Sequence, residues 1–180
     1  MRVTAIKKHL TIYSIFGRRK TTINHAFASA ISPCDQYSEA DVKEAVHALG
    51  QDPEADLECV YCGKEAETWD HVFATVENGE FSGAGHRLGN LLPCCKPCNS
   101  KKGNRPWSIF MDSLEMSDEE RLSRKGTIER YLKRFFRRDS PPSKSEDYLK
   151  LLSIRDQVIE LLKQGDVIAA SIRSKATRSK

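Results

Sequence analysis

The chain has 180 residues and a formal net charge of +4, from 29 Lys and Arg against 25 Asp and Glu, and it contains six cysteines. This length allows one domain, or a core with a helical extension. A chain of this size can bury roughly 70% of the surface that it exposes when unfolded. No uninterrupted apolar stretch of about 18 residues is present, which excludes a transmembrane helix. Polar residues also break the basic N-terminal segment early, so we expect a cytoplasmic protein without a signal peptide.

Charge is distributed unevenly along the chain. Residues 1–20 carry six basic and no acidic side chains, residues 21–100 four basic and thirteen acidic, and residues 101–180 nineteen basic and twelve acidic. The resulting net charges of +6, −9 and +7 are those expected if the middle holds a divalent cation and the ends bind a polyanion. Solvated helix faces are the alternative explanation.

We expect the first third of the chain to be mostly helical. Residues 5–16 alternate loosely and fit either a strand or a short helix. A helix is predicted over about 23–31, and a second over about 39–49 has Ser38 as its N-cap and Gly50 at its end.

The middle of the chain, from about residue 52 to residue 103, lacks the helical period. Short runs at 68–73 and 90–93 stand out there among Gly, Asn and Ser residues. This pattern predicts a hairpin with a long loop.

Helices are again predicted after residue 106. A short one covers 107–114, with Trp107, Ile109, Phe110 and Leu114 as its candidate buried side chains. A longer helix begins at Ser117, which forms a capping-box pattern with Glu120, and runs to about residue 138.

The longer helix is amphipathic and strongly basic. Its apolar stripe consists of Ile128, Tyr131, Leu132, Phe135 and Phe136. Its other side carries the candidates for phosphate contacts, which are Arg130, Lys133, Arg134, Arg137 and Arg138. Residues 18–20 and the C-terminal tail are further basic candidates, and a solvated helix face is the alternative.

The last helical region is predicted to begin with Ser143 and Glu146 as its cap. Its apolar residues continue to Leu162, Gly165 interrupts it, and the basic tail over 173–180 should be frayed.

Two Cys-x-x-Cys pairs stand 32 residues apart, Cys59 with Cys62 and Cys95 with Cys98. Two such pairs supply the four tetrahedral sulfur ligands that a structural Zn²⁺ prefers. Disulfides are the competing interpretation, but paired thiols in a reducing compartment more often hold metal. Because a four-cysteine site has no open position, this zinc would stabilise the fold and perform no chemistry. Cys94 could replace Cys95 as a zinc ligand, but its spacing from Cys98 would then exceed two residues.

Phosphodiester hydrolysis is one chemistry that the middle segment could support. It needs an activated water and stabilisation of charge on the scissile phosphate and the departing oxygen. A histidine with an ordinary pKa of about 6.5 can take the proton of the water, so His71 is the candidate general base. The neighbouring Asp70 points to the other face of a strand, and its hard carboxylate suits Mg²⁺ or Mn²⁺.

Four segments carry a more specific order of residues. They read Cys-Val-Tyr-Cys-Gly at 59–63, Trp-Asp-His-Val at 69–72, Gly-His-Arg-Leu-Gly-Asn-Leu-Leu-Pro at 85–93 and Cys-Lys-Pro-Cys-Asn-Ser-Lys-Lys-Gly at 95–103. Together they resemble the HNH endonuclease family over about residues 56–106. The resemblance implies an α+β protein whose zinc-stabilised ββα-metal core lies between a mostly helical region at 1–55 and a basic helical region at 107–180.

The resemblance also implies roles for individual residues. Asp70 and the side-chain oxygen of Asn99 would bind the catalytic ion, which contacts the scissile phosphate and the leaving 3′ oxygen. Asn90 would hold the hairpin loop and orient the general base. Lys102 would contact phosphate, with Lys101 as a second candidate, and the product would carry a 5′ phosphate and a 3′ hydroxyl.

The loop between the two strands departs from the family pattern. The proline that commonly follows the catalytic histidine is absent, with Phe73 and Ala74 there, and residues 83–85 replace the usual Gly-Gly. We assign His86 to loop ordering or a phosphate contact, with a part in the chemistry as the alternative. Cys34 receives no role.

The implied function is a metal-dependent endonuclease that cuts double-stranded DNA, of the kind used in prokaryotic or phage restriction, defence or mobile elements. A homodimer is a hypothesis, because cleavage of two strands by a one-metal site usually needs two active sites or two nicks. No membrane partner is expected. The alternatives are a zinc-stabilised nucleic-acid-binding module without cleavage and a nuclease acting on RNA.

Overall fold

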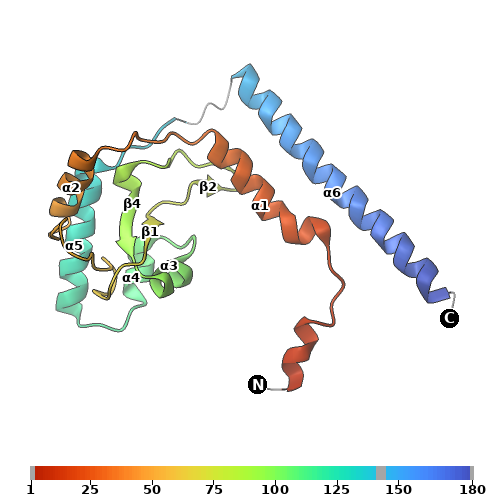
Figure 1. Ribbon diagram of the computed structural model, residues 1–180, viewed down its shortest axis with the longest axis horizontal. Coiled ribbons are helices and arrows are strands. Elements are labelled where there is room, and N and C mark those ends of the chain that lie inside the picture. The colour runs from red at the N-terminus through yellow and green to blue at the C-terminus, as the bar shows by residue number, and fades with distance from the viewer. Residues whose placement is uncertain (1–2, 141–144, 179–180) are drawn as a thin grey trace. The chain divides into compact units, whose positions relative to one another are not determined.

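The computed structural model describes residues 3–140 and 145–178 (Figure 1). The chain divides into two compact units, one formed by residues 28–141 and the other by residues 1–27 together with 142–180. Along the chain the elements are η1 (Val3–Lys8), α1 (Ile15–Ala30), α2 (Glu39–Ala48), β1 (Thr68–His71), β2 (Val76–Glu77), β3 (Glu80–Phe81), η2 (Leu88–Asn90), β4 (Leu91–Cys94), α3 (Lys96–Lys102), α4 (Trp107–Asp112), α5 (Asp118–Phe135) and α6 (Glu146–Arg178). None of the described helices has both the length and the hydropathy that a membrane span requires.

Two antiparallel strands and the helix that follows them form the centre of unit 28–141. Strand β1 pairs with β4, which places Asp70 opposite Leu92 and His71 opposite Leu91, and α3 begins two residues after β4 ends. The predicted hairpin with a long loop is therefore confirmed. Its loop contains a second, smaller hairpin of β2 and β3, whose turn at Asn78 and Gly79 has positive φ at both residues.

The helices around this centre begin where local capping predicts. Ser38 Oγ accepts a hydrogen bond from the N–H of Asp41 at 3.3 Å, and Ser117 Oγ accepts one from the N–H of Glu120 at 3.1 Å. Gly50, with a φ of 75°, follows the end of α2.

A continuous core joins the helices to the strands. Its most deeply buried side chains, each at most 1% exposed, include Tyr61, Leu92, Phe110, Ile128 and Tyr131. Burying one such side chain stabilises the fold by roughly 1.5–3 kcal/mol. The hydroxyl of Tyr131 donates a hydrogen bond to the carbonyl of Leu88 at 2.7 Å, so α5 is tied directly to η2. The predicted apolar stripe of α5 thus faces the core.

Two expectations for α4 and α5 were wrong in detail. Ile109 is 58% exposed, and Met111, fully buried, takes the core position in α4 together with Trp107 and Phe110. Helix α5 ends at Phe135, because the next residue has an extended backbone, and so Arg137 and Arg138 lie beyond the helix.

The second unit, residues 1–27 with 142–180, departs further from the sequence predictions. Helix α1 begins at Ile15, whereas its start was predicted near residue 23. Asp166 caps it, accepting hydrogen bonds from Ser14 Oγ at 2.7 Å, the N–H of Ile15 at 2.6 Å and the N–H of Phe16 at 3.1 Å. A cap from a residue 150 positions away is invisible to a local pattern.

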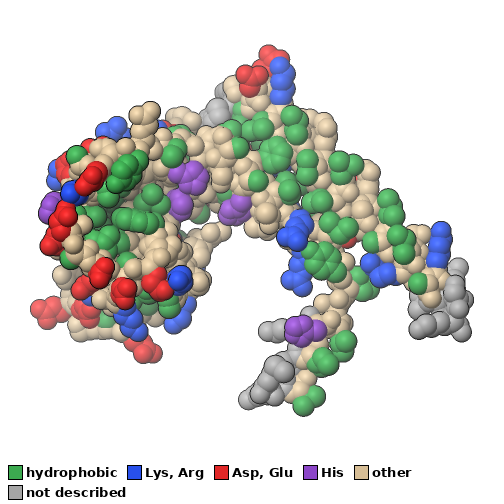
Figure 2. All heavy atoms as spheres, viewed as in Figure 1, with side chains coloured by type: hydrophobic (Ala, Val, Ile, Leu, Met, Phe, Trp, Pro, Cys, Tyr) green, Lys and Arg blue, Asp and Glu red, His purple; other side chains and the backbone are tan. Residues whose placement is uncertain are grey.

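Helix α6 is continuous, so the predicted interruption at Gly165 was wrong. A Cβ at Gly165 would stand 3.2 Å from Ile15 Cδ1, so this glycine permits close packing of α1 on α6. Ser143 lies outside the described residues, and Ser145 Oγ accepts from the N–H of Tyr148 at 3.1 Å instead. The tail that was predicted to fray is helical as far as Arg178, and hydrophobic side chains are visible along α6 (Figure 2).

Candidate functional site

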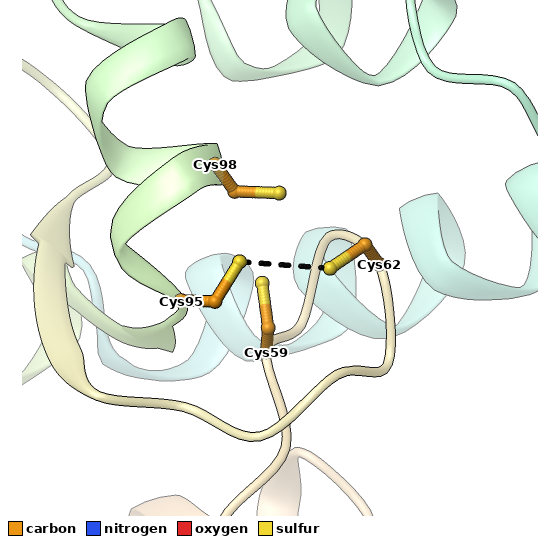
Figure 3. A group of neighbouring side chains, drawn as sticks. All are labelled: Cys59, Cys62, Cys95 and Cys98. Carbon is orange, nitrogen blue, oxygen red and sulfur yellow. Dashed lines mark hydrogen bonds between the residues drawn. The ribbon is translucent and has the colours of Figure 1, made fainter.

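The four predicted cysteines form one cluster, the cysteine cluster (Cys59, Cys62, Cys95 and Cys98). Their sulfur atoms all lie within 4.8 Å of one another, and the Sγ atoms of Cys62 and Cys95 are 3.7 Å apart (Figure 3). A tetrahedral zinc with Zn–S bonds of about 2.3 Å separates its sulfurs by about 3.8 Å. The donor type, number and spacing therefore fit an ion such as zinc.

Local backbone geometry creates the cluster. The turn after Cys59 closes through a hydrogen bond from the N–H of Gly63 to the Cys59 carbonyl at 2.8 Å, with Gly63 at a φ of 72°. Cys95 is the N-cap residue of α3 and Cys98 lies in the first turn of that helix. A turn and a helix start thus bring two pairs of thiols to one point.

The protonation behaviour of these thiols also fits a cation. Burial raises the pKa of the Cys62 and Cys98 thiols, since several thiolates cannot share a buried space without a positive charge. The pKa of Cys59 is lowered to about 4, chiefly through its hydrogen bond with the thiol of Cys94, whose sulfur is 3.9 Å away. Cys94 is thus a buried neighbour of the cluster, and Cys34 is exposed elsewhere.

His71 lies at the end of β1, half-buried, and meets a second histidine. Its Nε2 is 3.0 Å from Nδ1 of His86, and the two rings are steeply inclined at 74° with their centroids 5.1 Å apart. The pKa of His71 lies below the ordinary 6.5, first because burial disfavours the charged ring and then because His86 and Lys102 repel it, while Asp70 opposes the shift.

Asn90 holds the backbone on both sides of this histidine pair. Its side-chain oxygen accepts from the N–H of Phe73 at 2.9 Å, and its amide nitrogen donates to the carbonyls of Phe73 at 3.0 Å and Gly85 at 3.1 Å. Phe73 is two residues after His71, and Gly85 immediately precedes His86. Asn90, only 1% exposed, therefore fixes the segments that carry the two imidazoles. We call His71, His86 and Asn90 the histidine centre.

Asp70 points away from the histidine centre into the protein. Its carboxylate accepts from the hydroxyl of Tyr61 at 2.7 Å and forms an ion pair with Lys102 Nζ at 3.0 Å. Burial, together with the nearby Asp70 charge, raises the pKa of Tyr61, so this hydroxyl stays a donor.

Lys102 is 2% exposed and also donates to the carbonyl of His71 at 2.9 Å. The ammonium of Lys102 thus faces Asp70 and the chain interior, and its expected contact with phosphate stays a prediction. Its neighbour Lys101 is exposed.

Asn99 lies in α3 and is half-buried. It directly follows Cys98 and precedes Lys101 and Lys102 on the same helix. Within the described residues its side-chain amide makes no hydrogen bond, whereas the amide of Asn90 makes three. The side chain of Asn90 is thus occupied by backbone hydrogen bonds, whereas the amide of Asn99 can still bind a ligand.

The five basic candidates around α5 are all exposed: Arg130, Lys133, Arg134, Arg137 and Arg138. Arg134 is paired with Glu44, and Figure 2 shows acidic side chains interspersed with basic ones on the visible face of unit 28–141. The basic stripe expected from the sequence is therefore partly neutralised.

A cavity of about 470 Å³ is bordered by the residues after His71, the β2–β3 hairpin and the start of α4. Arg105 and Arg138 both line it, together with Phe73 and Asn104. The sequence predictions did not include Arg105. Its guanidinium stands over the ring of Phe110 at 5.3 Å, a contact between α4 and the turn after α3 that no local motif encodes.

Comparison with known proteins adds little to this geometry. No family model matches the chain, and no curated protein matches it. Among solved structures, the chain is similar to the Type II-C Cas9 enzyme from Actinomyces naeslundii at 23% identity and a TM-score of 0.33, over 81% of this chain and 16% of that one. The chain thus spans under a fifth of the Cas9 length, and a TM-score this low carries no functional argument.

Proposed function

We propose that this chain is a metal-dependent endonuclease of the HNH type that hydrolyses phosphodiester bonds in DNA, with His71 as the general base. The observation that carries the proposal is the set of hydrogen bonds made by the Asn90 side chain. They fix the backbone that follows His71, the last residue of β1, to the backbone that precedes His86. Of the four segments of the family resemblance, those at 69–72, 85–93 and 95–103 overlap β1, η2 with β4, and α3, and the one at 59–63 forms the turn of the cysteine cluster.

The lowered pKa of His71 supports its role. A ring whose pKa lies below 6.5 is mostly neutral at pH 7, so one nitrogen has a lone pair for the proton of a water molecule. The water oxygen then bonds to phosphorus, the bond from phosphorus to the 3′ oxygen breaks, and the water proton goes to His71. The products are a 5′ phosphate and a 3′ hydroxyl.

The side chains of Asp70 and Asn99 fit a catalytic divalent ion by donor type, because Mg²⁺ and Mn²⁺ prefer carboxylate and amide oxygens. Asp70 is paired with the Lys102 ammonium, which would have to move aside before a divalent ion could reach the carboxylate. Within the described residues, the cysteine cluster is the one group of three or more His, Cys, Asp or Glu ligands that could hold a metal, so phosphate and water oxygens would complete the second ion's shell. When bound, that ion would stabilise charge on the phosphate and on the leaving oxygen.

We further propose duplex DNA as the partner, contacted by Lys101 and by the exposed basic residues around α5. Arg105 and Arg138 in the cavity beside the histidine centre add two guanidiniums that can bind phosphate. A homodimer, a cytoplasmic location and a role in restriction, defence or mobile elements stay predictions.

One observation favours a second candidate function, a zinc-stabilised nucleic-acid-binding module without cleavage. The ion pair with Lys102 already neutralises Asp70, so the residue expected to bind the catalytic ion has a partner without it. The neutral, oriented His71 argues for the nuclease, since binding alone has no use for a base.

Plasmid nicking tests the two candidates. Zinc-loaded wild type should nick DNA with Mg²⁺ or Mn²⁺, and His71→Ala should lose about 10²–10⁴-fold of the rate. His47→Ala, an exposed histidine on α2, is the matched control and should cut as wild type does. Asn99→Ala should also lose cleavage, with unchanged thermal unfolding.

Three results would contradict the DNA nuclease. If His71→Ala cuts equally well, the general base is misassigned. If wild type binds DNA and never cuts it, the binding module is correct. If only RNA is cut, the substrate is RNA.

A further inference from the structure

We infer that His86 is a positioning residue for the general base: its Nδ1 accepts a hydrogen bond from Nε2–H of His71 and so leaves Nδ1 of His71 as the basic atom. This assignment rests on the proposed nuclease function. It favours, for this loop histidine, the chemical alternative over loop ordering or a phosphate contact and names the atom through which it acts.

A single proton lies between the two rings. Nε2 of His71 and Nδ1 of His86 are 3.0 Å apart, so one of them donates and the other accepts. If His86 were the donor, a neutral His71 would carry its own proton on Nδ1 and would have no free lone pair. A neutral His71 that acts as a base must therefore be the donor, with its lone pair on Nδ1.

The loop holds His86 in place for this contact. The N–H of His86 donates to the carbonyl of Pro33 at 2.8 Å, and its carbonyl accepts from the N–H of Asp35 at 3.3 Å. Position 85 must be glycine, since a Cβ there would come within 2.4 Å of the Pro33 oxygen. The preceding carbonyl, of Gly85, is held by Asn90. The backbone of His86 is thus fixed from both sides, so the loop positions the ring.

The choice of an imidazole as acceptor has a chemical consequence. Within the described residues, neither imidazole has a carboxylate as a hydrogen-bond partner, because Asp70 faces Lys102 and Tyr61 and Asp35 binds Arg87. A neutral acceptor orients the ring of His71 without adding a negative charge beside it. During the reaction the water proton goes to Nδ1 of His71, and the proton on Nε2 stays in the bond to His86.

Three substitutions at position 86 separate positioning from other roles. In His86→Asn the side-chain oxygen can stand where Nδ1 stood, so it keeps an acceptor. His86→Leu keeps much of the volume without an acceptor, and His86→Gln places its amide about one bond further out. We expect kcat to fall about 10–100-fold in His86→Leu with little change in KM, and to recover largely in His86→Asn but not in His86→Gln.

Steady-state kinetics and thermal unfolding of the zinc-loaded protein distinguish the outcomes. A raised KM for DNA with unchanged kcat would make His86 a phosphate contact and overturn the inference. Equal losses in the Asn and Leu variants, in proportion to their loss of stability, would make its role structural and would also overturn it.

The tautomer itself can be read without cleavage, from the ¹⁵N shifts of the ring nitrogens in zinc-loaded protein free of other divalent ions. In the wild type we expect His71 with a protonated Nε2 and a bare Nδ1, and in His86→Leu a mixture of tautomers. A protonated Nδ1 on wild-type His71 would overturn it. Failure of the proposed function appears separately, as a wild type that cuts no nucleic acid whatever its tautomer.

Discussion

The cysteine cluster and the histidine centre lie on neighbouring parts of the same ββα unit and are built on opposite principles. The cluster uses one atom type four times, and each thiol stands three residues from its partner in the sequence. The histidine centre instead joins two imidazoles 15 residues apart by a hydrogen bond, and the Asn90 side chain holds the backbone of Phe73, 17 residues away, by two more. A tetrahedral sulfur site has no free position, whereas the histidine centre leaves one nitrogen of His71 uncommitted.

Under the proposed function, this difference separates stability from chemistry. The cluster can be closed because a bound ion would only have to join a turn to a helix. A histidine centre that acts as a base would have to keep a lone pair accessible, so its rigidity would come from residues such as Asn90 that do not react. The Asp70–Lys102 pair is buried in the same unit, and only the proposed function gives its carboxylate a part in binding a catalytic ion.

The largest effect is expected at the cysteine cluster. Cys62→Ser should remove the bound metal and abolish cooperative unfolding of residues 28–141, because structural zinc binding contributes about 10–16 kcal/mol in zinc-finger peptides. Metal content and thermal unfolding measure this. Cys34→Ser is the matched control, exposed and outside the cluster, and should keep one zinc per chain. A folded, metal-free wild type would overturn the assignment of the cluster as a zinc site.

A smaller but large effect is expected at the Asp70–Lys102 pair. Lys102→Met should destabilise the protein by about 3–5 kcal/mol, because it leaves the Asp70 carboxylate buried and unpaired. Lys101→Met, on the exposed face of the same helix, should change stability by less than about 0.5 kcal/mol. Chemical denaturation measures both variants.

Mg²⁺ sharpens this test of the pair. If Asp70 can hold a divalent ion, added Mg²⁺ should restore part of the stability of Lys102→Met and have less effect on wild type. If instead both lysine variants are equally stable and only Lys102→Met binds DNA weakly, then Lys102 contacts phosphate, as the sequence suggested.

Local signals in the sequence were sufficient for the cysteine cluster, the serine caps of α2 and α5, and the hairpin that carries Asp70 and His71. Each of these depends on residues a few positions apart or on a repeated chemical type. The contacts that the sequence did not predict depend on chain folding: His71 with His86, Asp70 with Lys102, and Asp166 at the start of α1. An isolated histidine, lysine or aspartate has no local sequence pattern that indicates which residue, about 15 to 150 positions away, it will contact.

The smallest effect, a shift in a pH profile, tests whether the histidine centre behaves as a buried, coupled pair. Burial lowers the pKa of His71, and so does repulsion from Lys102 and from His86 whenever His86 takes up a proton, while Asp70 acts in the opposite direction. A base with a lowered pKa stays unprotonated to lower pH, so the acidic limb of kcat/KM should lie below pH 6.5. In His86→Asn the repulsion from His86 disappears and burial remains, so the limb should move upward toward 6.5 without reaching it.

Acid also releases zinc by protonating the cysteines, and metal content must therefore be followed over the same pH range. If the acidic limb of wild-type kcat/KM lies at or above pH 6.5 while zinc is retained, the His71 ring is solvated during turnover. The histidine centre would then not be sheltered from water, and its contrast with the cysteine cluster would fail.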